Sequence, residues 1–417
     1  MQQQWIEMKK EAGDCILFFQ VGDFFEMFGD DAIEASEILE IALTARNKDK
    51  NAQSMCGFPM RSAEKYIAKL TRNGKKVAIV EQTTPPGKTK IVKRQITRIV
   101  TPGTTFSDQV LESGKSNFIA GLFFKEKNDT KEIAVSFAEL STGECFVQNF
   151  ADIVDAVKEI SLRNVAEVLL TPDQFKECSP YFNYFSGVLS RHFMPENTEK
   201  YLKNFFGVQT LKAFTIENNI SAISATALLC SFLEETQKIE LSHITGVSYK
   251  TNADILRLDV DTIRNLEIFT SSSGDKNNGL FKHINCTKTA MGSRMLQERM
   301  IQPFSKKNKI LAEYQNIAAL VQYPDLLDAI ISSFKKVSDL ERIIARISTQ
   351  RAVISDFVLL QKSIEEIDLL TVTIGEIIKN IKEEDIKEEN NTDEDSEQKA
   401  ALDSWIEWNE YCIELLN

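Results

Sequence analysis

Short apolar segments alternate with amphipathic ones over the first 110 or so residues of the chain. Apolar runs bounded by polar or turn residues predict strands at 15–19, 77–80 and 95–100. Apolar residues spaced three and four apart predict helices at 2–12, 30–39 and 63–73. Mixed strands and helices of this kind indicate an α/β domain, and we expect it to occupy residues 1–112.

A second unit is expected at residues 116–240. Its pattern predicts three consecutive strands, then a helix and a fourth strand, at 117–124, 133–139, 143–150, 153–163 and 167–170. This order suits a sheet of the RNase H type. Nucleases with that sheet hold Mg²⁺ on clustered carboxylates, and Glu139 could supply one, but the sequence shows no convincing second or third partner.

The pattern becomes helical from about residue 252. Leu311, Tyr314 and Ile317 follow the spacing of a helix, and the run at 336–366 is long and amphipathic. We therefore expect an all-α domain over 252–417. Within it, residues 383–399 are acidic and poor in apolar side chains, which predicts a disordered segment or a long exposed loop.

Composition is that of an ordinary soluble globular protein, with 43% hydrophobic and 26% charged residues. The sequence has no uninterrupted apolar window of about 18 residues, and its N-terminus does not resemble a signal peptide, so no membrane contact is expected. The seven cysteines are scattered without a Cys-x-x-Cys pair, and the three histidines are far apart. These observations favour reduced thiols in a cytoplasmic protein over disulfides or a metal site.

Charge is unevenly distributed along a chain whose formal net charge is −12. Residues 61–100, called the basic block below, carry eleven Lys or Arg and two Glu, a net charge of +9. Residues 381–400 carry three Lys and nine Asp or Glu, a net charge of −6. The basic block is either a solvated face or a surface that contacts phosphates. The motif that shares its predicted domain favours the second interpretation.

That motif is Gly22-Asp-Phe-Phe-Glu-Met-Phe28. On an extended segment, Phe24 and Glu26 project to the same side. The alternative is that the aromatic cluster is entirely core, but a carboxylate buried among rings would need a partner. The pair suits a probe of a base stack, because the ring can wedge between bases from the minor groove while the carboxylate accepts a hydrogen bond from a base edge.

The motif resembles the Phe-x-Glu signature of the bacterial MutS family of mismatch-recognition proteins. Other segments resemble that family in the same order along the chain: Gly57-Phe-Pro59, Arg98-Ile-Val-Thr-Pro-Gly-Thr104, Asp261-Thr-Ile-Arg-Asn-Leu-Glu267, Thr289-Ala-Met-Gly-Ser-Arg-Met-Leu296 and Ser338-Asp-Leu-Glu-Arg-Ile-Ile-Ala-Arg346. Phe25 stands where the family usually has Tyr, and Met60-Arg61 replace a usual Tyr-His. The resemblance covers residues 1 to about 380.

The resemblance implies a mismatch-recognition domain at 1–112, an RNase H-like connector at 116–240, and an incomplete core and lever domain at 252–417. Phe24 would stack on the mispaired or unpaired base, and Glu26 would hydrogen-bond it. The resemblance and the basic block together suggest contacts to the DNA backbone from Thr44, Arg46, Arg61, Lys93 and Arg98. The implied partners are double-stranded DNA with mismatches or small loops, a MutL-like protein bound through the connector and, in the full-length family protein, a second copy. The implied location is the cytoplasm, at the nucleoid.

ATP and Mg²⁺ are implied only for a full-length family member. Gly87-Lys88-Thr89 is not a phosphate loop, because Gln82 stands where the first glycine belongs and no helical pattern follows. We therefore expect no cofactor and no enzyme activity from these residues. Two other functions stay open: a split or remnant subunit that docks a separate ATPase chain and binds little DNA itself, and a nuclease that would lose Mg²⁺-dependent cleavage when Glu139 is replaced.

Overall fold

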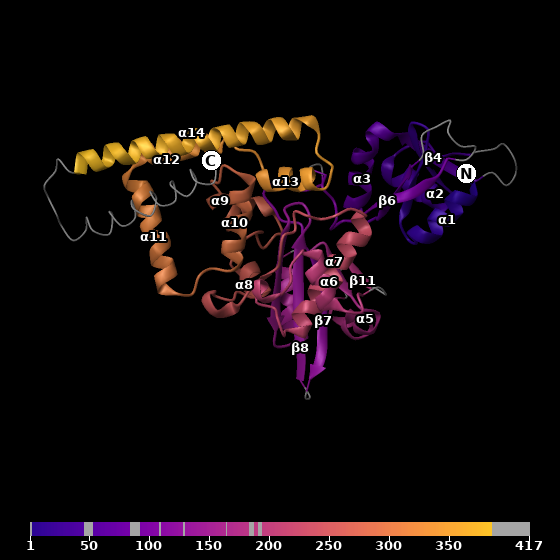
Figure 1. The fold of residues 1–417 in the computed structure, drawn as a ribbon, viewed down its shortest axis with the longest axis horizontal. Helices are drawn as coiled ribbons and strands as arrows, with labels where there is room; N and C mark the ends of the chain where they lie inside the picture. The colour runs from indigo at the N-terminus through magenta and orange to yellow at the C-terminus, as the bar shows by residue number, and fades with distance from the viewer. Residues whose placement is uncertain are drawn as a thin grey trace. The chain divides into compact units, whose positions relative to one another are not determined.

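The computed structural model describes residues 2–45, 53–83, 92–107, 110–127, 130–163, 165–182, 187–190 and 194–385. The chain divides into two compact units. Unit 1 comprises Met1–Glu112 and Ser116–Lys250, and unit 2 comprises Ser113–Lys115 and Thr251–Asn417. Mixed strands and helices make up unit 1, whereas unit 2 is helical (Figure 1).

The first sheet of unit 1, within the described residues, has six strands in the order β3-β4-β2-β1-β5-β6. The strands are β1 (Ile16–Val21), β2 (Phe24–Phe28), β3 (Thr44–Ala45), β4 (Ser54–Pro59), β5 (Val77–Gln82) and β6 (Arg94–Val100). The neighbours β1 and β5 are parallel, and the other neighbours are antiparallel. The predicted strands are confirmed with their ends shifted by a few residues, and β3 and β4 are additions that the sequence pattern did not reveal.

Side chains alternate between the two faces of this sheet, as the period of two in a strand requires. Phe18 and Phe25 pack with α2 (Asp30–Leu39) and α3 (Ala63–Arg72) on one face. Phe19 and Phe28 pack with α1 (Gln2–Ala12) on the other face. The bounds of α1 and α2 are those that the apolar spacing predicts.

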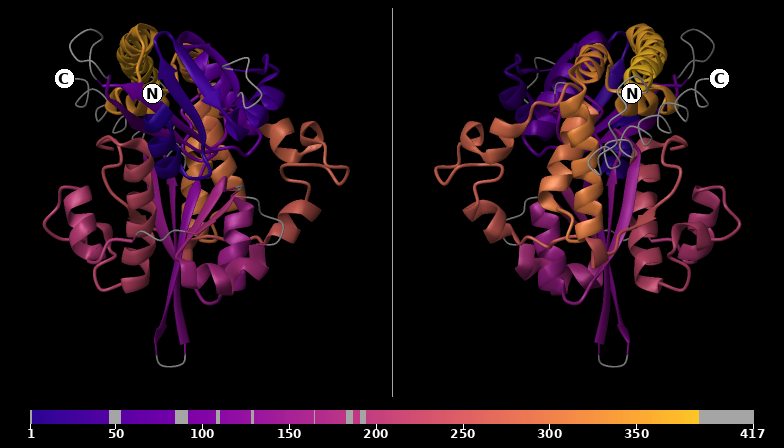
Figure 2. Two further views of the ribbon diagram at one scale, coloured as in Figure 1. Left: turned by 90° about the vertical axis from the view of Figure 1, so that its right-hand side faces the viewer. Right: turned by 90° about the vertical axis from the view of Figure 1, so that its left-hand side faces the viewer.

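The second sheet of unit 1 has the order β11-β10-β7-β8-β9-β12 among the described residues. The strands are β7 (Ile119–Lys127), β8 (Thr130–Glu139), β9 (Glu144–Phe150), β10 (Glu167–Leu170), β11 (Val188–Ser190) and β12 (Ser248–Tyr249). β7, β8 and β9 are antiparallel, and β7 and β8 form the long hairpin visible in Figure 2. β10 is parallel to both β7 and β11, and β12 is parallel to β9.

Helices cover both faces of this second sheet. α7 (Ile220–Gln237) packs on one face together with α6 (Thr198–Phe205), and α4 (Ile153–Leu162) and α5 (Pro172–Cys178) pack on the other. Gly121 on β7 allows the close approach of α7, because a Cβ atom there would lie 2.7 Å from the carbonyl oxygen of Ala225. The result is a three-layer arrangement with a core on each side of the sheet.

The described part of unit 2 consists mainly of helices joined by loops. They are α8 (Val260–Asn265), α9 (Leu280–Ile284), α10 (Ala290–Ile301), α11 (Lys307–Gln322), α12 (Pro324–Phe334), α13 (Leu340–Ser348) and α14 (Ile354–Asp385). α12 lies along α14 through a cluster of five buried residues, Leu326, Ile330, Leu370, Ile374 and Ile378 (Figure 1). Among the described residues, no single helix meets the length and apolarity of a membrane span, and only α11 with α12 does so jointly, across a 99° bend.

The structure of unit 2 differs from two predictions made from the sequence. The run at 336–366, predicted as one long amphipathic pattern, contains two helices, α13 and α14, separated at 349–353. Gln350 takes a left-handed backbone conformation with φ 56° in this break, and Arg346 bonds Asp356 across it at 2.6 Å. Of the acidic loop predicted at 383–399, the first three residues continue α14, and the rest lie outside the described residues.

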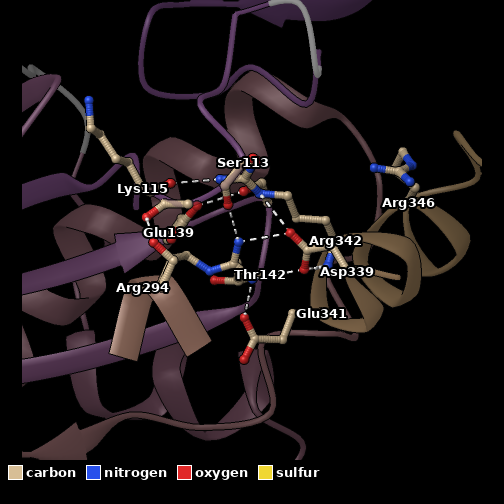
Figure 3. Close-up of polar contacts among 12 residues, drawn as sticks. Ser113, Lys115, Glu139, Thr142, Arg294, Asp339, Glu341, Arg342 and Arg346 are labelled. Carbon is tan, nitrogen blue, oxygen red and sulfur yellow. Dashed lines mark hydrogen bonds and ion pairs between the residues drawn. The ribbon is translucent and has the colours of Figure 1, made fainter. Parts of the chain in front are cut away.

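A three-residue strap, Ser113–Lys115, is bound by side chains of α10 and α13 within unit 2 (Figure 3). The guanidinium of Arg294 donates to the carbonyl of Ser113 at 2.8 Å, and that of Arg342 donates to the carbonyl of Lys115 at 2.7 Å. The carbonyl of Gly114 accepts from the hydroxyl of Ser293 at 3.3 Å and from the amide of Gln297. Each carbonyl of the strap therefore has a side-chain donor.

Candidate nucleic-acid interface

Strand β2 places the two residues of the candidate probe on one face. Its pattern alternates, with Phe25 and Met27 in the core shared with α2 and α3, and with Phe24, Glu26 and Phe28 on the opposite face. Phe28 is buried there, whereas the side chain of Phe24 is 48% exposed. A half-exposed ring at the start of a strand, beside a carboxylate, is the geometry that the sequence predicted for these two residues.

The turn before β2 brings a cation close to Phe24. Gly22 adopts φ 59°, a conformation that costs glycine little, and the chain then enters β2. Phe24 pairs in register with Pro59 at the end of β4, and the amide of Met60 donates to the carbonyl of Asp23 at 2.9 Å. Arg61, exposed in the short helical turn that follows, is thereby held next to the probe.

Glu26 is flanked by one small and one large neighbour. It pairs in register with Gly57 on β4 and with Phe19 on β1. A side chain at Gly57 would crowd this pair, because a Cβ atom there would lie 2.8 Å from the carbonyl oxygen of Phe25 and 3.5 Å from Cγ of Glu26. The glycine of the Gly57-Phe-Pro59 segment therefore allows β4 to lie close to the backbone of β2 beside Glu26.

Four cations of the basic block bond carboxylates in unit 1. The pairs are Lys69 with Glu40 at 3.1 Å, Lys75 with Glu34, Lys76 with Asp14 at 2.8 Å and Arg98 with Glu64 at 2.9 Å. Their charge is locally balanced, so they have less to offer to phosphates than the sequence count suggests. Arg61, Lys65 and Arg72 are exposed and form no ion pair within the described part of the chain.

The remaining backbone candidates are spread over the first sheet. Thr44 is exposed on β3, where its hydroxyl donates to the carbonyl of Met55 at 3.1 Å. Lys93 is exposed just before β6, and its carbonyl accepts from the amide of Thr83 at 3.0 Å. Arg46 and the Gly87-Lys88-Thr89 loop lie outside the described residues.

The Thr-Pro-Gly-Thr part of the segment at 98–104 has a structural function. A buried carboxylate, Glu167 on β10, accepts hydrogen bonds from the hydroxyl of Thr101 and, at 2.9 Å, from the amide of Gly103. A Cβ atom at Gly103 would lie 2.4 Å from Ile119. Burial raises the pKa of Glu167, and the hydrogen bonds from Thr101 and Gly103 oppose that rise. The sequence had no signal for this carboxylate.

Glu139, the candidate nuclease carboxylate, is buried at the end of β8 and accepts a hydrogen bond from the hydroxyl of Ser141 at 2.7 Å. Across the described ranges there is no group of three or more His, Cys, Asp or Glu that could hold a metal ion. The environment of Glu139 is therefore that of a buried structural carboxylate.

The chain matches three consecutive family profiles. They are described as MutS domain I, MutS domain II and MutS domain III, and they match residues 1–109, 117–245 and 261–410. The motif with Phe24 and Glu26 falls in the first of them, and the strap falls between the first two.

Curated relatives agree with these profiles. The DNA mismatch repair protein MutS of Treponema denticola is 31% identical over 400 residues, which are 92% of this chain and 44% of the relative. The proteins of that name from Lachnoclostridium phytofermentans and Halothermothrix orenii are 32% and 35% identical over 92% and 87% of this chain. The chain thus spans less than half the length of these relatives, 41–44%. It belongs to the MutS family of DNA mismatch-repair proteins.

Proposed function

We propose that this chain recognises mispaired or unpaired bases in double-stranded DNA, with Phe24 as a wedge and Glu26 as a hydrogen-bond acceptor. The observation that carries the proposal is the half-exposed ring of Phe24 beside Glu26, on one face of β2, in the segment that matches MutS domain I. Competition binding of a mismatched and a matched duplex to the purified chain, at one fixed salt concentration, tests it directly.

The selectivity has a physical cause. Inserting a ring between base pairs costs a few kcal/mol of lost stacking, and kinking the duplex adds deformation energy. A mismatch has already lost part of its stacking and stiffness, so the same insertion costs less there. Glu26 adds discrimination, because its carboxylate is repelled by phosphates unless a base donates a hydrogen bond to it.

Contacts to the DNA backbone would supply affinity without selectivity. Arg61 is the best supported of them, since it is exposed and follows by two residues Pro59, the register partner of Phe24. Thr44 and Lys93 are also exposed, whereas Arg98 would first have to leave Glu64. Arg46 stays a candidate on the sequence alone. Cationic contacts of this kind make binding fall steeply with salt.

Replacing Glu26 with Gln should strengthen matched-duplex binding relative to mismatched binding, by roughly threefold at low salt. The change removes a charge that phosphates repel and keeps a side chain that can hydrogen-bond. Fluorescence anisotropy with both duplexes measures it. Glu37→Gln, the same charge change at an exposed position of α2, is the matched control. Unchanged matched-duplex affinity in Glu26→Gln would show that Glu26 does not face DNA.

The three domains are assigned by analogy with the family. We assign residues 1–112 to mismatch recognition, 116–240 to an RNase H-like connector and 252–417 to a core and lever region. The sheet order β9-β8-β7-β10-β11, with the first three antiparallel, supports the RNase H-like assignment. A MutL-like protein docking on the connector, and pairing of two copies in the full-length protein at the nucleoid, complete the proposal. Glu139 would have no catalytic part in it.

Purified residues 1–417 should neither hydrolyse ATP nor bind it tightly, because the sequence has no loop that offers stacked backbone amides and a lysine to phosphates. Their DNA binding should be weak and salt-sensitive, since a ring closed by two copies could raise affinity roughly a hundredfold. Phosphate release and DNA titrations over a salt series check both points. ATPase activity that disappears in Lys88→Ala would instead identify Gly87-Lys88-Thr89 as a nucleotide site.

A further inference from the structure

Arg94 lies at the same end of the first sheet as the probe. Because β1 and β5 run parallel, their last residues, Val21 and Gln82, lie at one end of the sheet. Phe24 pairs with Val21, and Arg94 pairs with Gln82. The first residues of β2 and β6 therefore share that end, although β1 and β5 separate these two strands.

The side chain of Arg94 crosses the sheet towards Glu26. Its guanidinium carbon lies 4.9 Å from the centre of the Phe19 ring, on the face shared with α1. Phe19 is the register partner of Glu26, so the guanidinium covers the ring immediately beside the carboxylate side chain. A guanidinium placed over an aromatic ring is attracted to it.

Two glutamines hold Arg94 in this position. The Nε of Arg94 donates to the backbone carbonyl of Gln20 at 2.9 Å. Its Nη1 donates to the side-chain oxygen of Gln4 on α1 at 3.0 Å, while the amide of Gln4 donates to the carbonyl of Val92, also at 3.0 Å. A cation with these fixed bonds is oriented in advance and cannot move freely towards a phosphate.

The charges of Arg94 and Glu26 interact. Burial lowers the pKa of Arg94, and the carboxylate of Glu26 opposes this by raising it. Both side chains are partly buried, so the attraction is less screened than it would be between fully exposed groups. The positive charge in turn offsets the negative charge that Glu26 would present to a DNA backbone.

We propose that Arg94 is a positioning residue for mismatch discrimination: from above the Phe19 ring it orients the carboxylate of Glu26 beside Phe24 and balances its charge. The inference rests on the proposed function of Phe24 and Glu26. It differs from a simple phosphate contact, which would strengthen binding to matched and mismatched duplexes alike.

The test is a double-mutant cycle read as a ratio of affinities. The ratio of mismatched to matched binding is measured at one low salt concentration for the wild type, Arg94→Met, Glu26→Gln and the double variant. Arg94→Met should lower the ratio about fivefold, the upper end of what a charge pair near the surface contributes. In the Glu26→Gln background the same change should have little further effect.

Two further variants distinguish a positioning role of Arg94 from two other causes of a lower ratio, namely misfolding and the loss of one positive charge. Arg94→Lys keeps the charge but lacks the planar fork, so it should retain an intermediate ratio. Lys76→Met removes a cation that pairs with Asp14 at the opposite end of β5, and it should leave the ratio unchanged. If Arg94→Met does not fold, as judged by circular dichroism, the cycle is run with Arg94→Lys, whose smaller loss must likewise vanish with Glu26→Gln.

An unchanged ratio in Arg94→Met, an equal loss on both duplexes, or an undiminished effect in the Glu26→Gln background would overturn the inference. The wild-type measurement tests the proposed function separately from the role of Arg94. If the wild-type chain shows no preference for the mismatched duplex, the proposed function itself is wrong. That result would overturn the proposed function and this inference together.

Discussion

Phe24→Ala should abolish the preference of this chain for a G·T or one-base-loop duplex over a matched duplex, and leave the salt-dependent binding to both. Phe24 is 48% exposed, so its truncation should cost less folding stability than the truncation of a fully buried ring. Stacking of a base on an aromatic side chain contributes about 1–3 kcal/mol, which corresponds to a loss of mismatch affinity of roughly five- to 150-fold.

The matched control for this prediction is Phe357→Ala. Phe357 is 54% exposed on α14 of unit 2, so the substitution removes the same ring from a similarly exposed site. Competition binding at fixed salt compares the two variants with the wild type. Full mismatch preference in Phe24→Ala would show that the assigned role of Phe24 is wrong.

Arg294→Met should destabilise α10 and α13 of unit 2 by about 3 kcal/mol. The guanidinium is buried and bonds Asp339 through two hydrogen bonds of 2.8 Å, Glu341 at 2.6 Å and the strap carbonyl of Ser113 (Figure 3). Burial lowers the pKa of Arg294, but the bonds to Asp339 and Glu341 more than compensate, so the pKa is raised. Methionine would fill the volume and leave Asp339 without its main counter-charge.

Hydrogen exchange is the suitable measurement, because a multidomain chain need not unfold in two states. Amide protection in residues 290–301 and 340–348 should fall roughly a hundredfold, and protection in β7 and β8 of unit 1 should not change. Arg264→Met removes an exposed partner of Asp261 and should cost less than about 0.5 kcal/mol. Equal protection in Arg294→Met and the wild type would mean that the buried pair contributes no net stability.

The sequence predicted the elements whose signal is local. α1 and α2 begin and end where apolar spacing places them, because a helix with one buried face shows the period of its own turns. Strand β4 was missed, since Ser54–Pro59 contains a glycine and a proline and becomes a strand through its pairing with β2. The break between α13 and α14 escaped detection because the amphipathic pattern continues on both sides of it.

The candidate site also has features that the sequence predicted and features that only the fold decided. That Phe24 and Glu26 share a face follows from the period of a strand, which is a property of neighbouring residues, so the sequence alone predicted it. Which cations stay available is decided by distant carboxylates: Lys69 and Arg98 bond Glu40 and Glu64, and no count of charge along the chain contains that information.

What the sequence by itself determined is the family, the main secondary-structure elements and the shared strand face of Phe24 and Glu26, because these depend on local order along the chain. Tertiary structure decided the partners of buried charge. The strap at Ser113 is held by Arg294, and Arg94 lies over the ring of Phe19, the register partner of Glu26, through strand pairing that joins distant segments. A buried or half-buried charge must find its partner in space, and the fold alone brings those partners together.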